Sequence, residues 1–171
     1  LFLEYGSGNS TLYAKKLKKK FLSIETDKSF YNFMRNKNIK NILYSNIGPT
    51  KYYSHPILPI FLLKKLIINY GNKIETFFNK FNDIPDLILI DGRFRVFVTL
   101  KVIKFCLSKN QKLNTVIIID DFKSRKDYHI LKKILKIKLI GRFGVIKLSK
   151  KTIININKIN KYLNKFILNY I

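Results

Sequence analysis

The segment Leu1-Phe-Leu-Glu4-Tyr-Gly6-Ser-Gly8-Asn-Ser10 joins an apolar run to a turn of glycine, serine and asparagine. A helical pattern follows to about residue 20, and a second apolar run, residues 21–26, contains Glu25. Glycine allows a tight turn and lets a ligand approach the backbone closely. An acid about twenty residues further on can accept hydrogen bonds from both ribose hydroxyls of an adenosine group. Strand, glycine turn, helix, strand and acid in this order predict a nucleotide-binding α/β unit.

Apolar runs and helical patterns go on alternating beyond this unit. Strands are predicted at 42–45, 87–91 and 116–120, and helices at 28–36, 57–81 (with a break near Gly71), 95–108 and 127–136. The runs at 87–91 and 116–120 are almost wholly apolar, which is typical of central parallel strands. Residues 138–149 read as a closing pair of strands. We expect a Rossmann-like α/β fold: a mostly parallel seven-stranded sheet with helices on both faces.

The length of 171 residues fits one domain, which we expect to cover residues 1–171. Its C-terminal part, residues 150–171, is predicted to hold an amphipathic helix whose apolar stripe starts at Ile156 and packs on the domain. Because the chain opens with Leu1 rather than Met, we expect the natural N-terminus to lie upstream. Apolar runs shorter than a bilayer needs and the single Cys106 favour a cytoplasmic protein without a transmembrane segment.

The net charge of +24 makes this a very basic protein, as expected of one that binds nucleic acid. Only five of its 34 basic residues are arginine, however, and Lys, Asn and Ile are the residues that AT-rich codons supply. Arginine reads phosphates and bases better than lysine does. We therefore expect the charge to be spread over the surface, and nucleic acid stays an alternative partner to a small-molecule substrate.

Several motifs point to one family. Glu4-x-Gly6-x-Gly8-x-Ser10 resembles the first motif of class I S-adenosylmethionine-dependent methyltransferases, and Ser-Ile-Glu25-Thr-Asp resembles their ribose-binding second motif. Residues 86–96 and 117–128 resemble the fourth and fifth strands of that fold with their turns. The Asp-Gly-Arg-Phe-Arg sequence at 91–95 resembles the signature of one subgroup of this family. The resemblance covers about residues 1–149 and implies S-adenosylmethionine as cofactor, bound by Glu4, Gly6, Gly8, Ser10, Glu25 and Asp91.

The same resemblance extends to a metal site. Catechol- and caffeoyl-type O-methyltransferases of this family hold a divalent cation with aspartates that match Asp91, Asp120 and Asp121. Carboxylate oxygens suit Mg²⁺ or Mn²⁺, and such an ion would lower the pKa of a substrate hydroxyl and orient it. Asp91 and Asp121 are then the expected catalytic residues. In the alternative reading, Asp120 or Asp121 only caps the following helix and Asp91 binds only the cofactor.

The general base of those enzymes has no counterpart here, because their lysine position is occupied by Phe94. Arg93 and Arg95 flank it and cannot act as bases. They are expected either to bind an anionic substrate or to pair with the aspartates. Tyr52 and Tyr53, after the third strand, are further candidates for lining a substrate pocket, and the nearby His55 is a weaker candidate base or ligand.

The expected function is S-adenosylmethionine-dependent O-methylation of a small or medium-sized hydroxyl substrate, with or without a divalent cation. RNA methylation is the alternative that the charge favours. Against it, the Asn/Asp-Pro-Pro-aromatic motif of exocyclic amino-group methylation is absent after residues 87–91, although ribose methylation stays open. A third hypothesis is a non-catalytic methyltransferase fold that binds nucleic acid or a protein partner.

Overall fold

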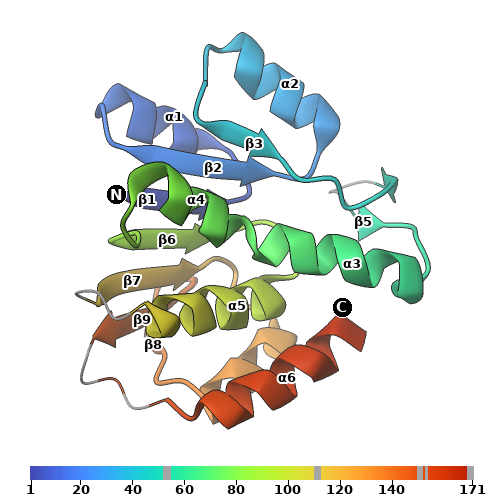
Figure 1. Ribbon diagram of the computed structural model, residues 1–171, viewed down its shortest axis with the longest axis vertical. Coiled ribbons are helices and arrows are strands. Elements are labelled where there is room, and N and C mark those ends of the chain that lie inside the picture. The colour runs from blue at the N-terminus through green and yellow to red at the C-terminus, as the bar shows by residue number, and fades with distance from the viewer. Residues whose placement is uncertain (52–54, 110–112, 150–151, 153, 169–171) are drawn as a thin grey trace.

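The computed structural model describes residues 1–51, 55–109, 113–149, 152 and 154–168. A seven-stranded sheet runs through its centre in the order β3-β2-β1-β6-β7-β9-β8 (Figure 1). Its strands are β1 Phe2–Tyr5, β2 Phe21–Glu25, β3 Ile42–Tyr44, β6 Leu87–Ile90, β7 Asn114–Ile119, β8 Lys138–Ile140 and β9 Phe143–Ser149. The first five are parallel, and β9 pairs antiparallel with both β7 and β8. The predicted fold class is confirmed.

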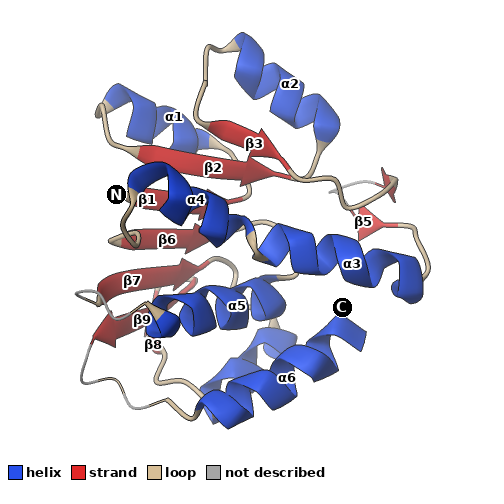
Figure 2. Ribbon diagram, viewed as in Figure 1, coloured by secondary structure: helices blue, strands red, loops and turns tan. Residues whose placement is uncertain are grey.

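Helices connect the strands and cover the sheet (Figure 2). They are α1 Asn9–Lys16, α2 Lys28–Asn36, α3 Ile60–Gly71, α4 Lys73–Phe81, α5 Arg95–Ser108, the 3₁₀ helix η2 Lys126–Lys133, and α6 Ile156–Leu168. α2 begins where the Asp27 side chain accepts a hydrogen bond from the N–H of Phe30, a normal N-cap arrangement. A two-stranded hairpin, β4 Thr50–Lys51 and β5 His55–Pro56, stands apart from the main sheet.

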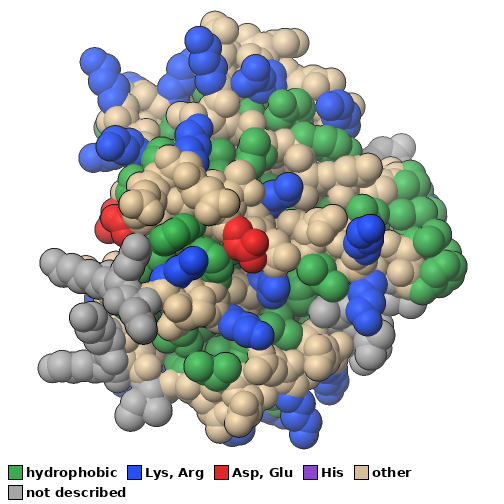
Figure 3. Space-filling model, viewed as in Figure 1, with side chains coloured by type: hydrophobic (Ala, Val, Ile, Leu, Met, Phe, Trp, Pro, Cys, Tyr) green, Lys and Arg blue, Asp and Glu red, His purple; other side chains and the backbone are tan. Residues whose placement is uncertain are grey.

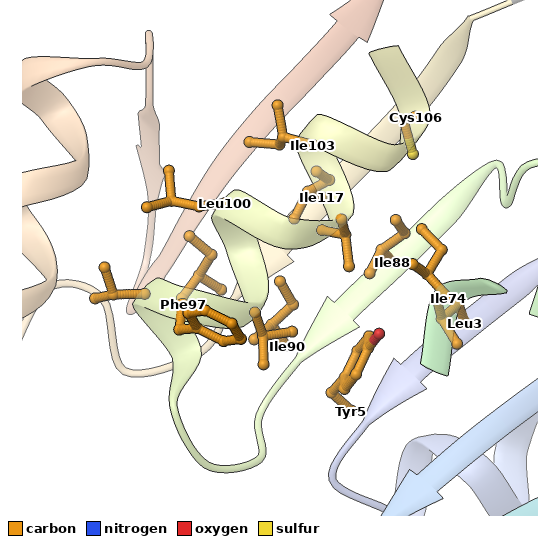
Figure 4. Packing of buried hydrophobic residues seen from close by; sticks show 14 of the residues in the cluster. Leu3, Tyr5, Ile74, Ile88, Ile90, Phe97, Leu100, Ile103, Cys106 and Ile117 are labelled. Carbon is orange, nitrogen blue, oxygen red and sulfur yellow. The ribbon is translucent and has the colours of Figure 1, made fainter. Parts of the chain in front are cut away.

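The two faces of the sheet carry two hydrophobic clusters, because successive side chains of a strand point to opposite faces. Leu3 and Tyr5 of β1 belong to the larger cluster, which also takes in buried residues of α3, α4, α5 and α6. Figure 4 shows side chains of β1, β6 and α5 meeting in this cluster. Phe2 lies against the smaller cluster with α1 and α2. Helices therefore cover both faces, as the sequence predicts.

The break between α3 and α4 coincides with a close approach of two helices. A Cβ on Gly71 would lie 2.8 Å from a ring carbon of Phe97 in α5, so a larger residue here would force the Phe97 ring or the helices to move. The hydroxyl of Tyr5 donates to the carbonyl of Gly71 at 3.0 Å, which ties β1 to the break. The interruption expected near Gly71 is confirmed.

Some local expectations were wrong. The 127–136 segment is a 3₁₀ helix that ends at Lys133, and the aromatic and β-branched residues at 128–130 are weak α-helix formers. α1 ends at Lys16 rather than near residue 20, since Lys18 adopts a left-handed φ of 52°. The β4–β5 hairpin has no clear signal in the sequence. Tyr52, Tyr53 and the side chain of His55 lie outside the described residues.

The C-terminal helix α6 packs on α3 and α5 through the predicted stripe. Ile159 and Leu163 are buried, whereas Ile156 at the start of the helix is exposed. No described helix combines the length and the apolar character that crossing a bilayer requires.

Substitutions on α6 test this packing. Ile159→Ala should lower the free energy of unfolding by about 2–4 kcal/mol, because a fully buried side chain leaves a cavity. Ile156→Ala, the matched change at the exposed end of the helix, should cost well under about 1 kcal/mol. Urea unfolding of both variants measures the difference, and equal losses would contradict the packing of this stripe.

Candidate active site

A cleft of about 690 Å³ opens at the carboxyl ends of β1, β2, β6 and β7. Ligands of open α/β sheets bind at this edge, where the order of the strands reverses, and the volume suits a small molecule. In this sheet the reversal lies between β1 and β6. The lining residues are Gly6, Ser7, Glu25, Thr26, Asp27, Phe30, Pro56, Asp91, Gly92, Arg93, Phe94, Arg95, Asp121, Arg125, Asp127 and Tyr128.

Two glycine turns meet at the floor of the cleft. Gly6, which follows β1, has a φ of +93°, and a Cβ on it would lie 2.6 Å from the backbone nitrogen of Gly92. Gly92, which follows β6, would collide through a Cβ with the hydroxyl of Tyr70. Neither turn therefore has room for a side chain. The close approach continues the parallel pairing of the strands, because the N–H of Asp91 donates to the carbonyl of Tyr5 at 2.8 Å.

The first turn is held from below by a buried carboxylate. Glu4 is fully buried and accepts hydrogen bonds from the hydroxyls of Ser10, Thr11 and Ser23, the last at 2.9 Å. Ser23 lies directly opposite Glu4 on β2. Burial raises the pKa of Glu4 above its usual value, and the three hydroxyl donors partly offset that effect.

The structure divides the residues of the predicted cofactor site into two groups. Glu4, Gly8 and Ser10 do not line the cleft, and Glu4 and Ser10 contact each other. The N-cap of α1 is Gly8, so Ser10 lies inside the first turn of the helix rather than capping it. Glu4 lies one residue before the end of β1, and Ser10 and Thr11 of α1 cover its carboxylate. Gly6, Glu25 and Asp91 do line it.

Glu25 ends β2 with both carboxylate oxygens engaged. One oxygen accepts the N–H groups of Thr26 and Asp27 at 2.7 and 2.8 Å. The other accepts the N–H and the hydroxyl of Ser7, at 3.0 and 2.5 Å. The Ser7 hydroxyl thus holds the kind of contact that a ligand hydroxyl would make. Sequence reasoning missed Ser7, because only the fold places it against Glu25.

The three aspartates predicted to form a metal site converge. Asp91, Asp120 and Asp121 each offer a carboxylate oxygen, and these oxygens lie within 4.8 Å of one another. Each carboxylate, however, has an arginine partner. Arg95 pairs with Asp91 at 2.9 Å and with Asp121 at 3.3 Å, and Arg142 pairs with Asp120 at 2.5 Å. Carboxylate oxygens suit Mg²⁺ or Mn²⁺, but all three carboxylates are already paired with guanidinium groups. The arrangement of these side chains therefore does not fit a divalent cation.

Asp91 is the most exposed of the three and lies in the cleft. Partial burial raises the pKa of its carboxyl to about 6, an effect that Arg95 opposes and the neighbouring Asp120 and Asp121 reinforce. A carboxyl of this kind changes charge close to neutral pH.

Arginines gather around this end of the sheet. Arg93, Arg95 and Arg125 line the cleft and Arg142 binds Asp120, which accounts for four of the five arginines in the chain. Arg95 was expected to bind substrate or the aspartates, and each of its three guanidinium nitrogens contacts oxygens of the protein. Arg125 and Arg142 complete the group. Arginine is rare in this chain, which has 29 lysines, and this rarity was the signal in the sequence that could have pointed to these residues.

A buried acid with a raised pKa makes stability depend on pH. The folded protein holds the Glu4 proton more tightly than the unfolded chain does, so this contribution is complete below the unfolded pKa and is lost as pH rises through the folded one. Glu4→Gln keeps the shape without the charge. Its free energy of unfolding relative to wild type should therefore increase between pH 4 and pH 7.

Urea unfolding at several pH values in that interval measures the effect. Glu75→Gln, at an exposed acid on α4, controls for the loss of one negative charge. Parallel pH profiles for wild type and Glu4→Gln would show that the buried carboxyl does not contribute.

The fold is shared with a protein of known structure. The chain superimposes on the crystal structure of a methyltransferase-like protein from Silicibacter pomeroyi with a TM-score of 0.76 and 24% sequence identity, covering 98% of this chain and 87% of that one. No protein-family model matches the sequence, and no curated protein is similar to it. The chain thus has the fold of a methyltransferase-like protein, with its polar cleft at the carboxyl edge of the sheet.

Proposed function

We propose that this protein is an S-adenosylmethionine-dependent methyltransferase that acts on a hydroxyl group of a small or medium-sized substrate. The observation that carries the proposal is the charge of the cleft. Its described lining holds three arginines and no lysine, against five of the ten acidic residues of the chain. They are Glu25, Asp27, Asp91, Asp121 and Asp127. A negatively charged cleft in a protein of net charge +24 favours a cationic ligand.

S-adenosylmethionine, when bound, supplies a methyl group on a positively charged sulfonium. Gly6 lines the cleft where the turn after β1 packs against the turn after β6, and Glu25 accepts the ribose hydroxyls in place of the Ser7 hydroxyl. Asp91 attracts the positive charge. α1 begins two residues after the cleft-lining Ser7, and the N–H groups at its N-terminus favour the methionine carboxylate.

The substrate side of the cleft holds Asp91, Asp121, Arg93 and Tyr128. Asp91 and Asp121 are the carboxylates that can accept the proton of a substrate hydroxyl. The pKa of about 6 places Asp91 in the range where a general base works well at neutral pH. Arg93 is half-buried in the cleft, and it would orient a substrate that carries a negative group.

The surface charge gives less support to a nucleic-acid substrate. On the face shown in Figure 3, Lys and Arg side chains are scattered and do not gather in one groove. Phosphate groups would also meet a cleft lined by five acidic residues against three arginines. A small or medium-sized hydroxyl substrate therefore agrees better with the site than RNA does.

Substitutions at the two partners Glu25 and Ser7 test the cofactor assignment. Glu25→Ala should weaken binding of S-adenosylhomocysteine by about 1–3 kcal/mol, because the hydrogen bonds to a charged acceptor are lost. Ser7→Ala removes only the competing hydroxyl, and it should leave affinity unchanged or a few-fold tighter. Isothermal titration calorimetry measures both. An absence of binding to wild-type protein would favour a non-catalytic fold instead.

The titration of Asp91 makes cofactor affinity depend on pH. Above pH 6 the carboxylate is ionised and attracts S-adenosylmethionine, whereas below pH 6 it is largely neutral. Affinity should therefore fall about 3- to 10-fold between pH 7.5 and pH 5, which corresponds to a shift of up to about one pKa unit on binding. Asp91→Asn should flatten this profile. An equally steep profile in the variant would assign the effect to another group.

A further inference from the structure

The guanidinium of Arg95 lies in a shell of five oxygen contacts. Its Nε–H donates to the carbonyl of Gly92 at 3.0 Å. One terminal nitrogen donates to the carbonyl of Asp120 at 2.7 Å and to the carboxylate of Asp121 at 3.3 Å. The other donates to the carbonyl of Asp91 at 2.9 Å and forms an ion pair with its carboxylate, also at 2.9 Å. The three nitrogens of the guanidinium thus contact five oxygens in all.

This shell joins the carboxyl ends of two neighbouring strands. Gly92 and Asp91 follow β6, whereas Asp120 and Asp121 follow β7. Three carbonyl oxygens and two carboxylates around one positive charge resemble the oxygen shell of a hard cation. Unlike a metal ion, this cation is covalently part of the chain and remains charged at all ordinary pH values.

The surrounding structure fixes the side chain of Arg95. Arg95 is the first residue of α5, and its side chain is only 12% exposed. Phe94 before it adopts a left-handed φ of 55°, a conformation that bulky residues avoid, and this sets the direction in which the helix starts. The ring of Tyr128 lies 5.8 Å from the guanidinium carbon. Arg142 reaches the remaining carboxylate, Asp120, from the β8–β9 turn.

We infer that Arg95 is the built-in cation of this acidic cluster: it occupies the position of a divalent metal ion and holds Asp91 and Asp121 in place, so that the site binds no divalent cation. Arg95 is in this sense a positioning residue. It neutralises the repulsion among three carboxylates that lie within 4.8 Å of one another. The inference concerns the site of the proposed function, but its test measures the binding of a metal ion and not of the methyl donor.

Mn²⁺ alone is the probe, and its binding is followed by the electron paramagnetic resonance signal of the free ion. Wild-type protein should bind no Mn²⁺ at concentrations up to about 1 mM, so any dissociation constant should be weaker than that value. Arg95→Gln removes the charge and should bind one Mn²⁺ per chain at least about tenfold more tightly than wild type. Arg95→Lys keeps a positive charge and should not gain the site.

Two further variants separate this effect from a general change in charge. Arg142→Gln also removes one positive charge from the cluster, but it leaves Arg95 in place and should bind no Mn²⁺. In Arg95→Gln, adding Asp121→Asn should abolish the gain. The test also works with an Arg95→Gln variant that is less stable than wild type, because melting temperatures can be compared with and without Mn²⁺. Mn²⁺ should raise the melting temperature of the variant and leave that of wild type unchanged.

One Mn²⁺ bound by wild-type protein would overturn the inference, whether or not the variants fold. A folded Arg95→Gln that gains no Mn²⁺ would overturn it as well. S-adenosylhomocysteine titrations of the same proteins report on the proposed function separately, so a failure of one proposal is distinguishable from a failure of the other.

Discussion

The contact between the turn after β1 and the turn after β6 is the constraint on which the site depends. The strands lie side by side in the sheet although about eighty residues separate them in sequence. Their turns touch through backbone atoms, because neither Gly6 nor Gly92 has room for a side chain. This closeness brings Glu25, beside the first turn, and Asp91, just before Gly92, to one cleft. A bulkier turn would push the two halves of the sheet edge apart and divide the lining of the cleft.

Two kinds of carboxylate surround this contact, and their environments make them do different things. Glu4 lies beneath the first turn, out of water, and serves the fold by accepting three hydroxyl donors. Glu25 and Asp91 lie above it at the cleft. Glu25 is held by N–H groups and by a serine hydroxyl that a ligand can replace, whereas Asp91 shares a cation with Asp121. By strand alternation these acids share one face of the sheet, so their position relative to the carboxyl edge, and not the face, separates the structural acid from those at the cleft.

Much of the fold could be predicted from the sequence because its signals are local. Alternating apolar runs and helical stripes define β1, β2, α2, β6 and α5 almost to the residue, and the ends of parallel strands indicate where a ligand can bind. The failures are equally physical. Motif spacing does not show that α1 covers the carboxylate of Glu4, and Ser7 meets Glu25 only after β1 and β2 pair. Arg142 reaches Asp120 from a turn 22 residues away, a contact that no local pattern encodes.

The distribution of arginine is the remaining link between composition and chemistry. A lysine ammonium is a compact charge with three N–H donors, and it serves well on a solvated surface. It cannot reproduce the planar fork with which Arg95 reaches five oxygens on two loops. In a chain with 29 lysines, an arginine therefore stands out where the geometry of the guanidinium matters and not merely its charge. Four of the five arginines lie at the edge of the sheet where the cleft opens, so the scarce residue locates the site better than the abundant charge does.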